Sequence, residues 1–334
     1  MKISYEQMQQ VLYDLFLRRG FTEEKARLIS YVFSVNTLSG VNSHGVNRVP
    51  SFIEFVEKGI VRPDAEAEKA SSFGSIERWD GHRGPGIVNA TKCTSRAIEL
   101  AKKHGMGLVA LRNTNHWMRG GTYGLQAANE GCIALFFTNT QPNMPPWGGK
   151  ESRTGNNPFI VGIPRKPEPV LLDMALSQFA FGKIHNYKLK GEQLPFPGGW
   201  DENNELSSDP EKILPNERGL PIGYWKGSAL SMVLDMLATL LSAGDSTFRI
   251  GQHSYETGIS QVFLCIYPEI FGDQDLQQQL LNEIIDYNHD VEPMSPGGRT
   301  YFPGEKSAMT RSRNLKEGIP VDEGIWQTIL DLSI

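Results

Sequence analysis

The spacing of hydrophobic and polar positions in the first sixty residues predicts a helical region. Apolar side chains recur there at intervals of three and four residues, which is the spacing of one helix face. A capping box at Ser4 begins a helix that ends at Gly20, and a second helix begins at Thr22 and ends at Gly40. A third helix is expected from Val49 to Val56. The polar residues just before it therefore lie in a turn between two helices.

From Ile76 onward, short apolar runs typical of buried strands alternate with helical periodicity. We expect strands at residues 107–111, 132–137, 158–163, 170–174 and 259–267, and helices from 89 or 91 to 104 and at 123–129, 228–241, 275–287 and 322–332. This alternation indicates an α/β fold. Residues 185–222 are rich in Pro, Gly, Asn and acidic residues, and they predict a long surface loop of the kind that often covers a site.

The length of 334 residues exceeds the usual size of a single core, so we expect more than one packed region. We divide the chain into an N-terminal helical region at residues 1–75, an α/β core at 76–290 and a C-terminal segment at 291–334. The C-terminal helices are expected to pack back on the N-terminal region.

Composition narrows the classes of partner. With 39% hydrophobic and 21% charged residues the chain is typical of a globular protein. A net charge of -5 provides no basic field for nucleic acid or for an anionic membrane, so we expect neither as a partner. The three widely spaced cysteines, Cys93, Cys132 and Cys265, indicate a reducing compartment. Because we see no signal peptide and no span long enough to cross a bilayer, we expect a cytoplasmic protein.

The segment Ser43-His44-Gly45-Val46-Asn47-Arg48 combines residue types that suit a small carboxylate with an oxygen on the neighbouring carbon. The guanidinium of Arg48 is a planar fork of donors that matches a carboxylate. The imidazole of His44 can give or take a proton near neutral pH. An alternative reading is a polar helix end, with His44 bonded to backbone and Arg48 solvated.

The common phosphate-binding motifs are missing. Gly105-Met106-Gly107-Leu108-Val109-Ala110 fits the pattern G-x-G-x-x-A, but its glycines follow a helix and precede a strand. Phosphate binding needs the opposite order, because the pyrophosphate must meet a helix N-terminus. The seven histidines show no metal-ligand spacing, so we expect no metal.

Several further segments are candidate site walls, each with a purely structural alternative. Asn115 to Gly121 follows a strand, where ligands of α/β sheets bind, although Trp117 could instead plug the core. Asp173 ends another strand and could bind a ribose hydroxyl or simply cap a turn. Lys226 precedes a helix start and could meet a phosphate or lie on the surface.

Taken together, four segments resemble the second type of malate/L-lactate dehydrogenase family, whose members lack the Rossmann fold. The resemblance extends from the first helix to the C-terminus, and the segments occur in the same order. They are Ser43-His44-Gly45-Val46-Asn47-Arg48-Val49-Pro50, Asn115-His116-Trp117-Met118-Arg119-Gly120-Gly121, Met144-Pro145-Pro146-Trp147-Gly148 and Gly223-Tyr224-Trp225-Lys226-Gly227-Ser228.

The resemblance implies a homodimer with an NAD cofactor in a family-specific, non-Rossmann α/β fold that carries an N-terminal helical cap. It implies that His44 is the proton donor to the substrate carbonyl. The cofactor contacts that it implies are at Pro169, Val170, Leu171, Leu172, Asp173, Met174, Ala175, Trp225, Lys226, Gly304, Glu305 and Lys306. At the last three positions similar reductases carry Gly-His-Glu, so backbone contacts would survive there and side-chain contacts would not. The resemblance also implies an insertion of one residue between residues 165 and 169, which shifts the start of the first cofactor segment by up to one position.

These observations lead to the hypothesis that the chain reduces the 2-oxo group of a sugar-derived 2-oxo acid with NADH. His44 gives the proton, Arg48 holds the carboxylate or a neighbouring oxygen, Ser43 orients it and His116 is a second donor. Alternatives are malate, lactate, a ureido acid or a cyclic imino acid as substrate, or a sugar-acid binding protein without catalysis. NADH is favoured over NADPH because no arginine cluster marks a 2′-phosphate pocket.

Overall fold

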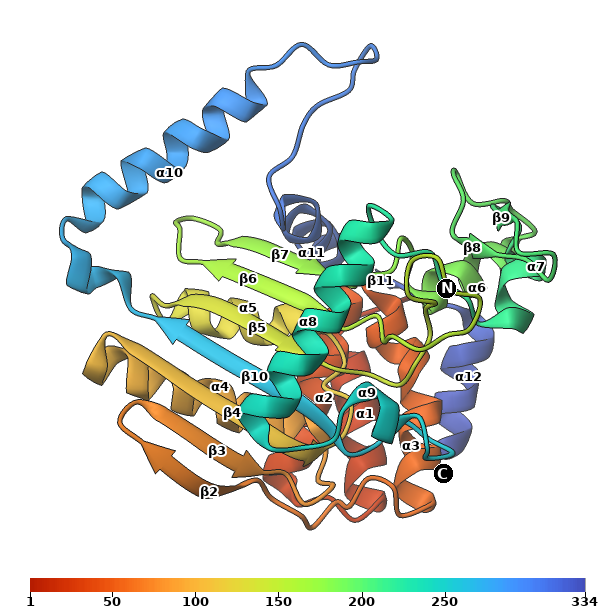
Figure 1. Ribbon diagram of the computed structural model, residues 1–334, viewed down its shortest axis with the longest axis horizontal. Coiled ribbons are helices and arrows are strands. Elements are labelled where there is room, and N and C mark those ends of the chain that lie inside the picture. Colours follow the sequence, from red (N-terminus) through yellow and green to blue (C-terminus); the bar gives the residue numbers. More distant parts are fainter. Residues whose placement is uncertain (334) are drawn as a thin grey trace.

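A seven-stranded mixed sheet runs through the middle of the protein (Figure 1). The computed structural model describes residues 1–333. The strand order is β2-β3-β4-β10-β5-β6-β7. Within the described residues, only β3 and β4 pair in parallel in this sheet. Consequently β4, β5 and β7 end at the same edge at which β6 and β10 begin.

The strands of this sheet are β2 (Glu68–Phe73), β3 (Ile76–Asp80), β4 (Met106–Thr114), β5 (Ile133–Thr138), β6 (Phe159–Ile163), β7 (Val170–Met174) and β10 (Ile259–Ile266). Two short pairs lie outside it, β1 (Lys2–Ile3) with β11 (Ile319–Pro320) and β8 (Gly199–Trp200) with β9 (Leu206–Ser207). A sheet with so many antiparallel pairs is not the parallel sheet of a Rossmann fold, which confirms that expectation.

The two faces of the sheet are covered by different helices. Phe263 and Cys265 of β10 point to the face covered by α4 (Gly86–His104) and α5 (Gly120–Asn129). Their neighbour Val262 packs with α8 (Trp225–Ser242) on the opposite face, as expected from the alternation of side chains along a strand. In Figure 1, α8 crosses in front of the sheet.

The N-terminal helices are joined by the C-terminal end of the chain. The helices α1 (Tyr5–Arg18), α2 (Glu23–Leu38) and α3 (Val49–Glu57) share one apolar cluster with Trp326 and Ile329 of α12 (Glu323–Leu332). The antiparallel pairing of β1 with β11 fastens the two ends of the chain together. The remaining helices are α6 (Phe181–Lys190), α7 (Pro210–Ile213), α9 (Thr247–Ile250), α10 (Gln274–His289) and α11 (Glu305–Glu317).

Every helix and strand expected from periodicity has a counterpart, but several elements were missed. The strand β2 was missed because all of its residues are exposed and it has no apolar face. The strand β3 has only five residues, and one of its two buried side chains, Glu77, is charged. The helix α6 lies partly in the expected loop and buries only Ile184. The helix α11 buries only Asn314, so it shows no apolar stripe. Pattern reading detects burial, and these elements bury little.

The glycines of the rejected phosphate motif serve packing. Gly105 ends α4 with a φ of 85°, in the left-handed region that glycine tolerates. Gly107 lies in β4, where an added Cβ would come 2.4 Å from the carbonyl oxygen of Ala97. The order of helix, glycines and strand is confirmed.

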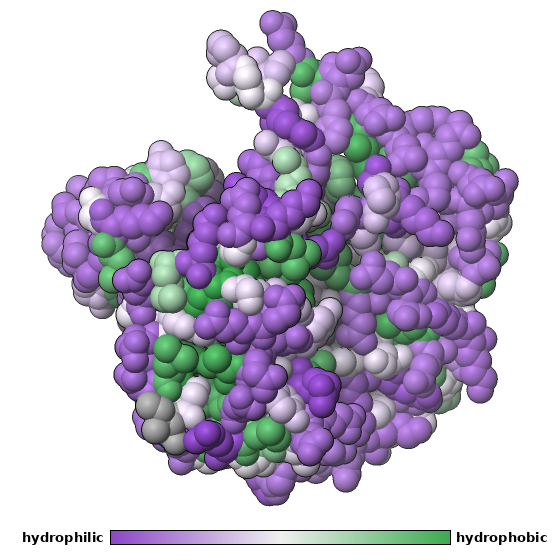
Figure 2. Space-filling model, turned by 180° about the vertical axis from the view of Figure 1, so that it is seen from behind, coloured by the Kyte–Doolittle hydropathy of each residue, from purple (hydrophilic) through white to green (hydrophobic). Residues whose placement is uncertain are grey.

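The surface seen from behind is mainly hydrophilic, with apolar residues in small patches (Figure 2). The lobe with α6, α7, β8 and β9 stands beside a hollow in this view. Within residues 1–333, no helix has the length and apolar character needed to cross a bilayer.

Candidate active site

A cavity of about 710 Å³ lies at the sheet edge where β4, β5 and β7 end. Its walls also include the connection between α2 and α3, the start of α6, the segment before β10 and the start of α11. All four predicted substrate-site residues, Ser43, His44, Arg48 and His116, line this cavity. The structure therefore brings together side chains that lie more than seventy positions apart in the sequence.

The turn that carries His44 consists of two short 3-10 helices, Asn42–His44 and Val46–Arg48, between α2 and α3. Side chains near the end of α2 hold it. The amide of Asn36 donates to the carbonyl oxygen of His44 at 2.9 Å, and the hydroxyl of Thr37 accepts from the N–H of Val46 at 3.0 Å. A Cβ at Gly45 would come 2.2 Å from the Thr37 hydroxyl, so only glycine fits at this approach.

The His44 ring has one weak polar contact and one stacking partner. Its Nδ1 lies 3.3 Å from the Ser43 hydroxyl, and its ring stacks on that of His116 with centroids 5.5 Å apart at 14°. Burial lowers the pKa of His44 to about 4 by disfavouring the imidazolium. Arg48 and Arg119 add to this lowering, whereas Asp173 opposes it. Without a ligand, His44 is therefore neutral near pH 7.

His116 is held in one tautomer by a strained turn. Met118 has a φ of 66°, an uncommon value for a residue with a side chain, and its N–H donates to Nδ1 of His116 at 2.9 Å. Because Nδ1 accepts this bond, the ring proton is on Nε2. Burial also lowers the pKa of His116 well below its ordinary value, so this ring stays neutral.

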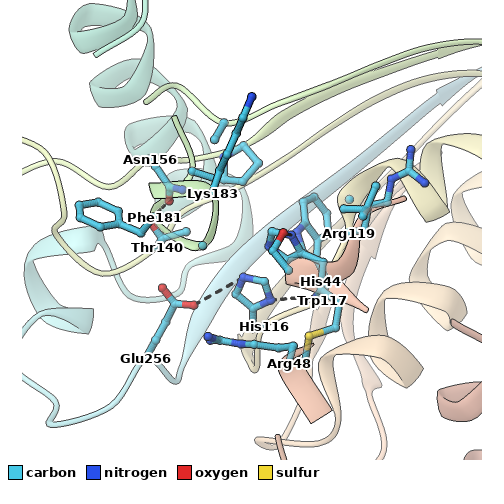
Figure 3. Close-up of a pocket in the computed structure, with 18 of the residues that line it drawn as sticks. His44, Arg48, His116, Trp117, Arg119, Thr140, Asn156, Phe181, Lys183 and Glu256 are labelled. Atoms are coloured by element: carbon cyan, nitrogen blue, oxygen red, sulfur yellow. Dashed lines mark hydrogen bonds and ion pairs between the residues drawn. The ribbon is translucent and has the colours of Figure 1, made fainter. Parts of the chain in front are cut away.

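Glu256 faces His116 across the cavity wall, and Figure 3 shows the His116 ring between its carboxylate and His44. Its Oε1 lies 4.0 Å from Nε2 of His116, and its Oε2 accepts from the N–H of Gln141 at 3.1 Å. Burial raises the pKa of this carboxyl above its ordinary value. Sequence reasoning missed Glu256, because nothing in the loop before β10 distinguishes it from a surface acid.

The two arginines of the cavity differ in their partners. The Arg119 Nε donates to Asp173 at 3.2 Å, at the end of β7. The Arg48 side chain has no hydrogen bond or ion pair to any residue that the structure describes. An unpaired guanidinium in the wall of a cavity suits an anionic ligand.

The predicted cofactor residues fall into two groups. Leu171, Asp173, Ala175 and Gly304 line the cavity. The N–H of Leu171 donates to the Pro303 carbonyl at 2.8 Å, which places β7 beside the start of α11.

The other predicted cofactor residues do not line this cavity; they are Pro169, Val170, Leu172, Met174, Trp225, Lys226, Glu305 and Lys306. Trp225 is 60% exposed, and the Lys226 ammonium lies 5.9 Å from its ring centroid. Glu305 pairs with His289 and Arg299, and the Lys306 ammonium lies 4.3 Å from the Tyr301 ring centroid. Their roles toward a cofactor stay predictions.

The cavity suits the phosphates of a dinucleotide. Gly120 of α5, and Gly304 and Ser307 at the start of α11, line it. Neither helix has a side-chain N-cap, so its first-turn N–H groups have no side-chain acceptor, and the positive end of each helix dipole lies at the cavity wall. Some first-turn N–H groups already have a backbone acceptor: Thr122 of α5 and Glu305 of α11 have one each, whereas α8 has two, at Lys226 and Gly227. No cluster of three metal-ligating side chains occurs among residues 1–333.

Comparison with known proteins identifies the family. The model of the malate/L-lactate dehydrogenase family matches residues 3–330 of this chain. The 2,3-diketo-L-gulonate reductases of Escherichia fergusonii and Escherichia coli K12 are each 44% identical to this chain over 330 residues, which is 98% of this chain and 99% of the relative. Malate dehydrogenase from Entamoeba histolytica has a TM-score of 0.95 at 26% identity, covering 100% of this chain and 97% of that chain. The chain is therefore an oxidoreductase and belongs to the malate/L-lactate dehydrogenase family.

Proposed function

We propose that this enzyme reduces the 2-oxo group of 2,3-diketo-L-gulonate with NADH, giving 3-dehydro-L-gulonate. The substrate comes from the names of relatives that are 44% identical over nearly the whole chain. The observation that carries the chemistry is the stacked pair of His44 and His116 beside the unpaired guanidinium of Arg48, all in one cavity. This arrangement offers an anion receptor next to a proton-transfer group, as reduction of a 2-oxo acid requires.

Arg48 binds the substrate carboxylate in this proposal. Its planar fork can donate two parallel hydrogen bonds, which fixes the direction of the adjacent carbonyl. Ser43 lies beside the His44 ring and orients it through the 3.3 Å contact to Nδ1.

His44 gives its proton to the carbonyl oxygen. Its pKa is lowered partly by the charge of Arg48, so a carboxylate bound to Arg48 offsets that charge and favours the imidazolium. The proton is therefore taken up together with the anionic substrate. In the reverse direction the neutral imidazole accepts the proton of the hydroxy acid.

The family implies a nicotinamide cofactor, which when bound supplies the hydride to the carbonyl carbon. Asp173, Leu171 and Gly304 would hold it, with the first turns of α5 and α11 near its phosphates. We favour NADH because the residues around the cavity form no arginine cluster for a 2′-phosphate.

The reaction is tested with a panel of acids, following the near-ultraviolet absorbance of NADH and NADPH. We expect the highest kcat/KM with 2,3-diketo-L-gulonate and NADH. A higher kcat/KM with oxaloacetate, pyruvate or a cyclic imino acid would show that the enzyme prefers another substrate of the family, and it would contradict the substrate proposed here. Binding of the sugar acid in calorimetry without any cofactor oxidation would indicate a binding protein.

We further propose a cytoplasmic homodimer. Exposed apolar residues follow one stripe of α8, at Leu230, Val233, Leu237 and Leu240, and a second stripe on α10, which extends away from the sheet (Figure 1). Contiguous exposed apolar residues of this kind are typical of surfaces at which protein subunits pack together. The three unpaired, buried cysteines suit a reducing compartment. Light scattering gives the mass in solution, and a monomer would contradict the dimer.

A further inference from the structure

Glu256 is a largely buried acid that the proposed chemistry does not use. Its side chain is 14% exposed and lines the cavity. One oxygen, Oε2, accepts from the Gln141 N–H, but Oε1 has no donor within hydrogen-bond distance among residues 1–333. This oxygen is therefore open to a donor that a ligand in the cavity supplies.

The group opposite Oε1 is a fixed donor. The Met118 N–H occupies Nδ1 of His116 at 2.9 Å, so Nε2 carries the hydrogen and faces Glu256. The distance of 4.0 Å between Nε2 and Oε1 is too long for a direct hydrogen bond. A donor and an acceptor therefore stand opposite each other with a gap between them, at the cavity wall (Figure 3).

A hydroxyl group fits this gap. An oxygen placed about 2.8 Å from both atoms lies to one side of the line between them, and its two hydrogen bonds meet at about 90°, about 20° less than the tetrahedral angle. That oxygen would accept from Nε2–H of His116 and donate to Oε1 of Glu256. A carbonyl or carboxylate oxygen cannot do both, because it has no hydrogen to donate to Glu256.

We propose that His116 and Glu256 form a hydroxyl-reading pair that selects polyhydroxylated 2-oxo acids over unhydroxylated ones. The pair lines the same cavity as Arg48, so the hydroxyl that it reads belongs to the same small molecule whose carboxylate Arg48 holds. This inference rests on the proposed function and adds the group that determines its specificity. A site built to bind a hydroxyl strongly rejects an analogue without it, because its own polar groups are then left unpaired.

The substitution Glu256→Gln replaces the acceptor of the pair with a donor, and the side chain keeps almost the same size. The Gln141 N–H needs an acceptor, so the amide oxygen of the new side chain takes the place of Oε2. The amide NH2 then takes the place of Oε1, and it faces Nε2–H of His116 and any ligand hydroxyl with a second donor. Glu151→Gln is the matched control, because Glu151 is exposed and pairs only with Arg153 in the described part of the chain.

The experiment measures kcat/KM for 2,3-diketo-L-gulonate and for 2-oxohexanoate, which has the same chain length but neither the hydroxyls nor the 3-oxo group. In Glu256→Gln we expect kcat/KM to fall at least about 30-fold for the hydroxylated acid and less than about threefold for 2-oxohexanoate. The control should change neither value. A merely structural role of Glu256 would lower both values equally.

Equal losses with the two acids, or no loss with either, would overturn the hydroxyl-reading pair. A wild-type enzyme that reduces 2-oxohexanoate but not the hydroxylated acid would also overturn it, while leaving the reductase chemistry intact. A wild-type enzyme that oxidises neither NADH nor NADPH with either acid would overturn the proposed function and this inference together.

Discussion

The two histidines of the cavity come from regions that hold their side chains in opposite ways. His44 lies on the turn between α2 and α3, and its ring has a 3.3 Å contact to Ser43. His116 lies on the loop after β4, and a strained residue fixes its Nδ1 with a 2.9 Å bond. A ring that moves a proton must be free to change its bonding, whereas a ring that positions a ligand is improved by rigidity. The first region therefore suits chemistry and the second suits recognition.

The strongest test of this contrast is His44→Ala. Removal of a proton donor typically costs about 100- to 10,000-fold, so we expect kcat for the oxo acid to fall at least about 100-fold. NADH binding, measured by fluorescence titration, should remain nearly intact because the imidazole faces the substrate. Full activity in this variant would eliminate His44 as the donor.

The pH dependence of kcat/KM is the next test that distinguishes the roles of His44 and His116. Reduction needs protonated His44, whose pKa in the free enzyme is about 4, so kcat/KM should fall about tenfold per pH unit as the pH rises from about 5 to about 8. The oxidation of the hydroxy acid needs the neutral ring, so its kcat/KM should stay level over that range. The residual activity of His44→Ala should lose the slope for reduction. A level profile for wild-type reduction contradicts the assignment.

Arg48→Lys tests the geometry of the anion receptor. Lysine keeps the charge but not the fork, and loss of one charge-assisted hydrogen bond corresponds to about a tenfold rise in KM for the oxo acid. The KM for NADH should not change. Equal increases in the KM values for the oxo acid and for NADH would show that Arg48 does not bind the substrate carboxylate. Steady-state kinetics with each reactant varied in turn distinguishes these results.

The smallest effect is expected for His116→Gln. A glutamine amide keeps an N–H donor near the position of Nε2 but cannot take a proton, so kcat should stay within about fivefold of the wild type. His116→Leu removes the donor and should lower kcat/KM for the hydroxylated acid by about tenfold or more. If His116→Gln were as inactive as His44→Ala, both rings would transfer protons and the contrast would be wrong.

The sequence by itself determined the helices of the N-terminal region, the buried strands and the family. Those features leave a periodic apolar pattern or a contiguous motif such as Ser43 to Arg48, and both can be read without knowing any contact. The reversed order around Gly105 was enough to exclude a phosphate-binding turn. In contrast, α11 and β2 were missed because they bury almost nothing.

Only the tertiary structure decided which side chains meet. The distance between His116 and Glu256 depends on β4 and β10 being neighbours, which brings residues 140 positions apart to within 4.0 Å. The tertiary structure also shows that the Arg48 side chain has no hydrogen-bond or ion-pair partner among the described residues. It shows as well that the N–H of Met118, a residue with a strained φ, fixes the tautomer of His116. The hydrophobic pattern of a segment indicates which of its residues are buried. The distances between side chains of different elements, and the strain in the backbone, arise only when those elements pack together. For that reason the family could be recognised from the sequence, whereas the pair that we propose for substrate specificity could not.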